Sequence, residues 1–205
     1  MANYIFETIT DAQALAFTNA DTLAFAAGTN AATISVVYIP AAGADPERVS
    51  ITANGVTKIF GDGIYNTTHT TTGGGVLYIG GTGNDTPAAG GSAPDAMYGG
   101  VGNDSMSAGA GNNLLQGNAG NDSLTATTGN DTVYGGAGND TVSAGLGSNW
   151  VQGNLGNDSI VGGSASNTAD TLLGGQGNDT ITAGAGADFV NGNLGDDSLT
   201  GGAGN

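Results

Sequence analysis

The stretch Gly135-Gly136-Ala137-Gly138-Asn139-Asp140-Thr141-Val142-Ser143 sets the pattern for most of this chain. It has the form G-G-x-G-x-D-x-U-x, in which U is a large apolar residue. The glycines allow a turn with positive φ that aims carbonyl oxygens inward, and the aspartate adds an anionic oxygen. The last three residues form a short strand that buries U against its neighbours. Oxygen atoms arranged in this way suit a hard cation, and calcium fits this chemistry best.

Variants of this nine-residue phrase recur from Gly80 to the last residue. The spacing of nine is broken by one extra residue near Ala89 and by three near Asn167. One copy alone is ordinary turn chemistry, because Gly-Asn-Asp is common in turns. About a dozen copies with one period indicate a repeat architecture instead. Apart from Pro87, the eighth position is aliphatic: Met97, Met106, Leu115, Leu124, Val133, Val142, Val151, Ile160, Leu172, Ile181, Val190 and Leu199.

Residues 80–205 resemble the repeats-in-toxin (RTX) family, whose hemolysin-type nonapeptide repeats bind calcium. The resemblance implies an all-β fold, namely a parallel β-roll, or calcium-binding β-solenoid, with a row of calcium ions along each edge. It also implies a secreted, extracellular or cell-surface protein of the bacterial type. RTX relatives usually leave the cell by type I secretion through an uncleaved C-terminal signal. Since this sequence stops in mid-repeat at Asn205, that signal lies elsewhere or the sequence is truncated.

Composition separates two parts, and we expect a β-rich capping and assembly module at residues 1–79 and the β-roll at residues 80–205. Both basic residues, Arg48 and Lys58, lie in the first part, whereas the repeats hold twelve Asp and no Lys or Arg. Without cations these carboxylates repel one another, and about six bound calcium ions would neutralise them. The apolar core is small for the length of chain that must be ordered. We therefore expect the repeats to be disordered without calcium.

The acidity, a formal net charge of -16, argues against nucleic acid and anionic membranes as partners. No stretch is long and apolar enough for a transmembrane segment, and residues 1–30 lack an ordinary signal peptide. The absence of cysteine excludes disulfides and suits a chain exported unfolded. No nucleophile motif or phosphate loop is present, so we expect no catalytic residues, no organic cofactor and no enzymatic activity. The one histidine, His69, is expected in a solvated loop.

Residues 1–79 carry recognisable local signals. Thr10-Asp11-Ala12-Gln13 is typical of a capping box at the start of a short helix. Thr33–Ile39 is a β-branched run, and Asn54-Gly55 between Val49–Ala53 and Val56–Phe60 favours a type I′ hairpin. A last strand at Val76–Ile79 leads into the first turn. Such a module caps the apolar end of a solenoid.

Consecutive turns of a roll lie on opposite edges, so alternate turns form two sets. Edge one comprises Gly80–Asp85, Gly99–Asp104, Gly117–Asp122, Gly135–Asp140, Gly153–Asp158, Gly174–Asp179 and Gly192–Asp197. Edge two comprises Gly90–Asp95, Ala108–Asn113, Ala126–Asp131, Ala144–Asn149, Gly162–Asp170, Ala183–Asp188 and the unfinished Gly201–Asn205. Every turn of edge one ends in Asp, which predicts about six good calcium sites there. Edge two has lost charge at Asn113 and Asn149, so we expect few sites, and Asn149→Ala should matter little to calcium-coupled folding.

The candidate calcium ligands occupy positions two, four and six of the turns. On edge one they are Gly81, Gly83, Asp85, Gly100, Gly102, Asp104, Asn118, Gly120, Asp122, Gly136, Gly138, Asp140, Asn154, Gly156, Asp158, Gly175, Gly177, Asp179, Asn193, Gly195 and Asp197. On edge two they are Asp95, Asp131, Asp170 and Asp188.

The two faces of the roll are also predicted to differ, because positions seven and nine point outward. After edge one these positions are mostly Ser and Thr. After edge two they include Tyr98, Leu114, Tyr134, Trp150, Leu173 and Phe189. An exposed apolar patch of this kind marks an interface, either with the N-terminal module or with a neighbouring molecule. A longer period is also visible, since Gly99–Tyr134, Gly135–Leu173 and Gly174–Asn205 align as units of two coils.

These features favour a secreted, calcium-folded structural protein that self-assembles head to tail into a surface layer, matrix or filament. Its partners are then other copies of itself and a cell-surface component. If the terminus at Asn205 is native, Asn3–Phe6 of the next molecule is the expected strand at the open end. Three alternatives remain: a secreted toxin or contact-dependent bacteriocin, an ice- or surface-binding adhesin module, and a secretion domain lost from an enzyme.

Overall fold

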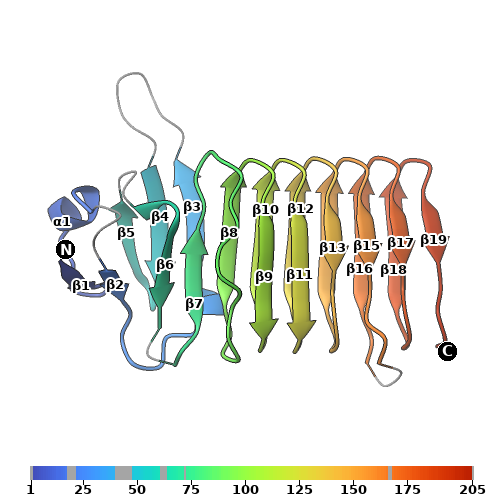
Figure 1. The fold of residues 1–205 in the computed structure, drawn as a ribbon, viewed down its shortest axis with the longest axis horizontal. Coiled ribbons are helices and arrows are strands. Elements are labelled where there is room, and N and C mark those ends of the chain that lie inside the picture. Colours follow the sequence, from blue (N-terminus) through green and yellow to red (C-terminus); the bar gives the residue numbers. More distant parts are fainter. Residues whose placement is uncertain are drawn as a thin grey trace.

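The computed structural model describes residues 2–17, 22–39, 48–60, 64–71, 73–165 and 168–204. The larger part is a parallel β-roll, in which two sheets face each other and share one long axis (Figure 1). The N-terminal module lies at one end of this axis. The predicted all-β fold with a parallel β-roll is confirmed.

The longer sheet of the roll has eight strands among the described residues, and the facing sheet has six. All of their pairings are parallel except that between β6 and β7. The order in the eight-stranded sheet is β18 (Phe189–Leu194), β16 (Thr171–Gln176), β14 (Trp150–Leu155), β12 (Thr132–Ala137), β10 (Leu114–Ala119), β8 (Ala96–Val101), β7 (Val76–Ile79) and β6 (Thr67–Thr70). The order in the six-stranded sheet is β19 (Ser198–Thr200), β17 (Thr180–Thr182), β15 (Ser159–Val161), β13 (Thr141–Ser143), β11 (Ser123–Thr128) and β9 (Ser105–Ala110).

Equivalent residues of neighbouring coils lie side by side along the roll. Asp104 and Asp122 of adjacent coils are 18 residues apart in sequence. The separation rises to 19 between Asp85 and Asp104, across the extra residue, and to 21 between Asp158 and Asp179, across the three extra residues. It returns to 18 between Asp179 and Asp197. The insertions are therefore absorbed in the turns, and the strands on both sides stay in register.

The core of the roll consists mainly of aliphatic side chains from both sheets, because alternate residues of a strand point to opposite faces. Leu115, Val133 and Val151 of the longer sheet are fully buried, as are Ile160 and Ile181 of the shorter sheet. These residues occupy the eighth position of the repeats. Alanines at the first position of the edge-two turns are also buried in this core: Ala108, Ala126 and Ala144.

The described part of the N-terminal module contains one short α-helix, one 3-10 helix and two small sheets. Helix α1 (Asp11–Leu15) has Thr10 as its N-cap, and the predicted capping box with Gln13 is present. Strand β1 (Asn3–Ile5) pairs in parallel with β2 (Thr22–Ala24). After the 3-10 helix η1 (Ala31–Thr33), the antiparallel strands β3 (Ser35–Ile39), β4 (Arg48–Ala53) and β5 (Val56–Phe60) form the second small sheet.

The predicted hairpin between β4 and β5 is confirmed. Ala53 pairs with Val56, and Asn54 and Gly55 have φ values of 51° and 75°, as a type I′ turn requires. Lys58 lies opposite Ile51 on the buried face, and its Nζ reaches the Asp11 Oδ1 at 2.9 Å. The long side chain thereby keeps its charge at the surface.

The module and the roll share one core at their junction. Strands β6 and β7 belong to the eight-stranded sheet, and Leu77, Ile79 and Tyr98 pack in the same cluster as Phe6 and Phe60. The Tyr98 hydroxyl donates to the Ile34 carbonyl at 2.6 Å. The module therefore covers the first coil from outside and closes that end of the roll.

His69 is buried, and its prediction as a loop residue is wrong. It lies in β6 with only 3% of its surface exposed. Its Nε2 is 2.8 Å from the Thr67 Oγ1, and its ring meets that of Phe17 edge-on at 5.9 Å. Burial lowers the pKa of His69 to about 4, so the folded module holds a neutral imidazole. Thr67 and Thr70 gave the segment a polar appearance in the sequence, although alternate residues of β6 face inward.

None of the helices in the described ranges is long and apolar enough to cross a membrane.

Candidate metal centres

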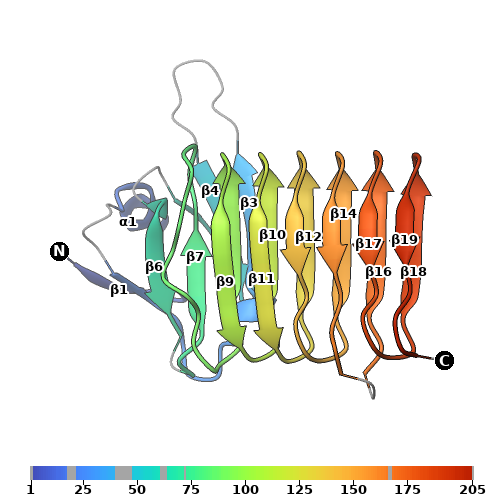
Figure 2. The ribbon, with the colours of Figure 1, turned by 45° about the vertical axis from the view of Figure 1, so that its right-hand side comes forward.

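The turns form two straight rows along the edges of the roll (Figure 2). Within edge one, positions two and four adopt positive φ in each coil from the second onward, for example 123° at Gly136 and 130° at Gly138. Asparagine replaces glycine at position two in Asn118, Asn154 and Asn193, with φ between 71° and 80°. Asparagine is among the few residues that tolerate this region. The predicted turn conformation is therefore present.

Glycine at position four is required for a second reason, namely the close approach of the coils. A Cβ on Gly138 would run into the carbonyl oxygen of Gly120 in the preceding coil. Glycine at position one has a different role. A Cβ on Gly135 would meet the Oδ2 of Asp140 and would lie 2.7 Å from the Gly153 carbonyl oxygen of the next coil. The glycines thus clear the space in which the aspartate and the carbonyl oxygens gather.

The first turn, Gly80–Asp85, departs from this pattern. Gly81 and Gly83 do not have positive φ. The Gly81 N–H donates to the Oδ1 of Asn66 and to the Oδ2 of Asp85, both at 3.1 Å. The bond to Asn66 joins this turn to the module. The bond to Asp85 already occupies the Oδ2 that is unpaired in most of the later turns of this edge.

The aspartates at position six join each coil to the one before it. The N–H of Asp122 donates to the Oδ1 of Asp140 at 2.8 Å, and the N–H of Asp140 donates to the Oδ1 of Asp158 at the same distance. The same bond recurs along edge one from Asp85 to Asp197. One carboxylate oxygen of each linked residue is therefore used in a ladder parallel to the roll axis.

The other carboxylate oxygen has no partner in most of these residues. Among the described residues, seven buried Oδ2 atoms lack a hydrogen bond, and all belong to position six of the repeats. A buried unpaired carboxylate oxygen is strongly unfavourable, because the folded chain replaces none of its hydration. A divalent cation would satisfy it. The seven residues are Asp95, Asp104, Asp122, Asp131, Asp140, Asp158 and Asp179.

Asn113 indicates where such a cation would sit. Its Oδ1 accepts the ladder bond from the Asp95 N–H, as the Oδ1 of an aspartate does. Its Nδ2 donates to the carbonyl oxygens of Gly111 at 2.9 Å and Gly109 at 3.4 Å. The second side-chain atom of position six therefore faces the carbonyls of positions two and four. An aspartate Oδ2 in the place of this amide would face the same carbonyls, which is repulsive unless a cation lies between them.

Burial raises the pKa of all seven carboxyl groups, most clearly in the middle of edge one. The pKa of Asp140 rises to about 7 through burial, while the hydrogen bond from the Asp122 N–H lowers it and the Asp122 and Asp158 carboxylates raise it. Burial likewise raises the pKa of Asp104 and Asp158 to about 6. The pKa values of Asp95, Asp122, Asp131 and Asp179 shift in the same direction. Without a metal, this site disfavours the charged form of each carboxyl group, and a bound cation would stabilise it.

Side chains alone do not complete these centres. No group of three or more His, Cys, Asp or Glu residues that could hold a metal occurs within the described ranges. A calcium ion takes six to eight oxygen ligands. In a calcium centre, backbone carbonyls would therefore supply most of the shell, and the aspartates would supply the charge. The glycine and asparagine residues predicted at positions two and four would contribute through these carbonyls, and the number of ions remains a prediction.

The two edges are more alike than their sequences suggest. Asp95 and Asp131 of edge two have the same unpaired buried Oδ2 as the edge-one residues. Asp170 instead accepts a hydrogen bond at its Oδ2 from the Gly163 N–H, at 2.7 Å. Asn149 accepts the ladder bond from the Asp131 N–H and donates its Nδ2 to the Asp170 Oδ1 at 3.1 Å. Asn149→Ala is thus not a neutral change, because it removes contacts between three coils.

The sequence reasoning missed a second ladder, at position five of the turns. The N–H of Asn121 donates to the Oδ1 of Asn103, and that of Asn139 donates to Asn121, at 2.8 and 2.7 Å. These bonds run toward the preceding coil, opposite to the aspartate bonds. The recurrence of asparagine at this position was the available signal. The exposed row comprises Asn84, Asn103, Asn121, Asn139, Asn157, Asn178 and Asp196.

Comparison with known proteins agrees with this geometry. The family model of the RTX calcium-binding nonapeptide repeat (4 copies) matches residues 88–115, 116–151, 143–171, 164–199 and 187–205. These matches overlap or adjoin, and together they span more than half of the chain. No curated protein and no solved structure matches the sequence. From the repeat, the stacked aspartate turns and the family match together, the chain belongs to the RTX calcium-binding nonapeptide repeat family.

Proposed function

We propose that this is a secreted structural protein, without enzymatic activity, whose roll folds when calcium binds along its edges and whose copies join end to end. The observation that carries the calcium-dependent part is the row of buried aspartate Oδ2 atoms without partners. In calcium-poor surroundings these carboxylates oppose folding. In a calcium-rich exterior they hold the cations that join successive coils.

End-to-end assembly into a filament, matrix or surface layer is supported by the unequal ends of the roll. Leu172 and Ile181, in the second-last coil, are fully buried, whereas Leu199 in the last described coil is 50% exposed. The outer edges of β18 and β19 also have no neighbouring strand among the described residues. A solenoid end of this kind binds whatever completes its next coil. We propose that the N-terminal module of the next copy does so.

Asn3–Phe6 is not free to act as the added strand. Asn3–Ile5 already pairs with β2, and Phe6 is fully buried in the core of the module. Deleting residues 1–8 would therefore damage the module itself. The end contact is better tested from the other side, at Leu199.

The experiment is a calcium titration followed by circular dichroism, light scattering and electron microscopy. We expect β-structure to appear with calcium and filaments to follow, and a chelator should return unfolded monomers. Leu199→Asp places a charge at the open end, so it should abolish filaments while leaving the calcium-induced β-signal. Val161→Asp is the matched control, because Val161 is 46% exposed but lies on the outer face of β15.

Two results would contradict the proposal. A roll that folds fully in chelator would remove the role of calcium. A monodisperse monomer in saturating calcium would remove the end-to-end contact.

A further inference from the structure

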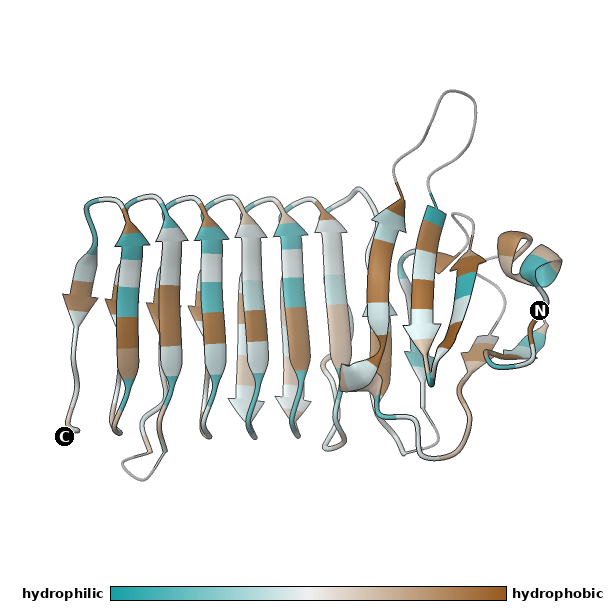
Figure 3. Ribbon diagram, turned by 180° about the vertical axis from the view of Figure 1, so that it is seen from behind, coloured by the Kyte–Doolittle hydropathy of each residue, from teal (hydrophilic) through white to brown (hydrophobic). Residues whose placement is uncertain are grey.

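The outer face of the eight-stranded sheet carries large apolar side chains that nothing covers within the described chain. We call the outward positions of β10, β12, β14, β16 and β18 the apolar face. Figure 3 shows brown apolar segments on these strands, beyond the area under the N-terminal module. Trp150 is 43% exposed and Phe189 59%, while Leu155 and Leu194 are 47% and 66% exposed. The module reaches Tyr98 and packs on Leu114, but no further. The predicted cover by the module thus applies to the first coils only.

The relief of this face alternates from coil to coil. In its first row, large side chains alternate with threonine: Leu114, Thr132, Trp150, Thr171 and Phe189. In its third row, asparagine alternates with glycine: Asn118, Gly136, Asn154, Gly175 and Asn193. The second row alternates in the opposite phase, with polar residues on the coils of Leu114, Trp150 and Phe189 and large residues on the other two: Gln116, Tyr134, Gln152, Leu173 and Asn191. Large and small side chains therefore form a checkerboard, which is the structural meaning of the two-coil repeat in the sequence.

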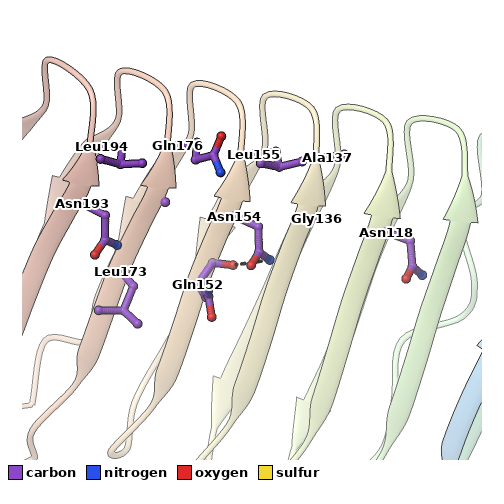
Figure 4. A pocket seen from close by; sticks show the side chains of 11 residues that line it. Asn118, Gly136, Ala137, Gln152, Asn154, Leu155, Leu173, Gln176, Asn193 and Leu194 are labelled. Atoms are coloured by element: carbon purple, nitrogen blue, oxygen red, sulfur yellow. Dashed lines mark hydrogen bonds between the residues drawn. The ribbon is translucent and has the colours of Figure 1, made fainter.

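A shallow groove of about 720 Å³ runs across the strands at the third row (Figure 4). It is lined by Leu155, Leu173 and Leu194 and by Gly136 and Gly175. At the φ values of Gly136 and Gly175, 123° and 127°, an added Cβ would run into a carbonyl oxygen of the preceding coil. The recesses are thus fixed by the backbone.

Two copies of this face are complementary in shape. When two such faces meet with their rolls antiparallel and offset by one coil, each large side chain of the first row faces a threonine of the other molecule. Each asparagine of the third row then faces a glycine. Facing sheets pack through interdigitated side chains of this kind.

Charge also favours a second copy over a charged partner. The sequences of the five strands contain no charged residue, although the chain has a formal net charge of -16. The carboxylates of the repeats all lie in the turns, at the edges of the roll. Face-to-face contact therefore keeps the carboxylates of two acidic molecules apart, whereas edge-to-edge contact would bring them together.

The area in contact is that of a weak, reversible dimer. An offset of one coil leaves four strands in contact, and at ~4.8 Å spacing and six residues of ~3.3 Å they give a face of about 19 by 20 Å. Two such faces bury up to about 760 Å², below the range of stable protein interfaces, so the dimer is expected to be transient. The N-terminal module stands on the same sheet and limits the overlap at one end, which again requires the rolls to be antiparallel.

We propose that the apolar face binds a second copy of this chain, forming an antiparallel, two-fold symmetric dimer that dissociates on dilution. This contact is separate from the end-to-end contact at Leu199. It joins two identical surfaces, so it stops at two molecules, whereas the end contact propagates.

The test uses Leu199→Asp as background in saturating calcium, so that end contacts do not interfere. Sedimentation equilibrium should show a monomer–dimer equilibrium. The emission of Trp150, the one tryptophan of the chain, should shift to the blue and become less quenched by acrylamide as the concentration rises. Adding Leu155→Ser and Phe189→Ser should weaken the dimer at least tenfold and leave the emission independent of concentration. Val161→Ser, on the opposite face, is the matched control and should change neither.

Each of the other outcomes overturns the proposal. A monomer at every concentration with a water-exposed Trp150 excludes the dimer. A dimer that survives Leu155→Ser and Phe189→Ser but is lost with Val161→Ser places the contact on the other sheet. Emission that shifts only when a soluble β-glucan is added assigns the face to carbohydrate. Circular dichroism in calcium must show the same roll in all variants. Loss of the face-to-face dimer would leave the calcium-induced folding and the end-to-end contact of the proposed function unaffected.

Discussion

At the scale of single residues, Asn113 and Asp140 are two versions of one position. Both use Oδ1 in the ladder between coils. In Asn113 the second atom is an amide that donates to the carbonyls of its turn, whereas in Asp140 it is an unpaired oxygen. Asn113 thus satisfies both of its side-chain polar atoms without a metal, whereas Asp140 leaves one buried oxygen that a cation would satisfy.

Asp140→Asn should therefore uncouple local folding from calcium. The amide would pair with the carbonyls of Gly136 and Gly138, removing a buried unsatisfied group that costs about 1–3 kcal/mol. We expect the calcium-free roll to become more stable by about that amount and the number of bound ions to fall. Isothermal titration calorimetry counts the bound ions, and the calcium concentration at the folding midpoint, followed by circular dichroism, measures the change in stability. Asn113→Asp is the reciprocal variant, and unchanged stoichiometry in both would refute the assignment.

The same carboxyl groups predict how the calcium-free roll responds to pH. The folded-state pKa of Asp140, about 7, lies above the ordinary value of 3.8, so the folded state binds its proton more tightly than the unfolded chain. In chelator, stability should rise as pH falls from about 7 toward 4. In calcium the order should reverse, because protons compete with the metal. Circular dichroism provides the test, since β-structure should grow in chelator as pH falls over this range, and equal pH dependence with and without calcium would count against buried ligands.

At the scale of elements, two glycines separate the effect of backbone conformation from that of packing. Gly55 and Gly138 both have positive φ, 75° and 130°. A Cβ on Gly55 meets nothing within 4 Å, whereas one on Gly138 would run into the Gly120 carbonyl oxygen. Gly55 lies in an exposed hairpin turn, and Gly138 lies between stacked coils.

Gly55→Ala should destabilise the hairpin by about 1 kcal/mol, the usual effect of forcing alanine into this region. Gly138→Ala should have a much larger effect, because it separates neighbouring coils and distorts the carbonyls that face the cation. Calcium-induced folding monitored by circular dichroism distinguishes the two. Similar calcium midpoints for both variants would show that the coils are not held so close together.

Most of the roll was predictable because one period sets both its strands and its turns. The repeat of nine placed the aliphatic core, the outward rows and the glycine turns, and the insertions near Ala89 and Asn167 fall where the separations rise to 19 and 21. The hydrogen bonds by which Asn113 satisfies its turn without a metal were not predictable, since they depend on which carbonyl oxygens its amide reaches. The burial of His69 was also missed, because it arises from packing against Phe17, far away in sequence.

At the scale of the whole molecule, the N-terminal module covers one end of the roll, and the two faces of the roll differ. The six-stranded sheet presents hydroxyl groups outward, interrupted by Val161, whereas the eight-stranded sheet presents Trp150 and Phe189. The two proposed contacts, one at the end of the roll and one on its face, would therefore be perpendicular. Together they would extend filaments in one direction and pair them in another, as a layer or matrix requires.

The enlarged turn at Gly162–Asp170 has a practical consequence. Extra residues there leave the strand register intact, since Trp150 still pairs with Thr171 and the next coil resumes the ordinary separation. Length added at this point leaves the strand pairing unchanged. Successive coils then lie at a constant spacing of ~4.8 Å along the axis. A foreign peptide inserted in this turn would be displayed at a set distance from both ends, in as many copies as there are molecules in the assembly.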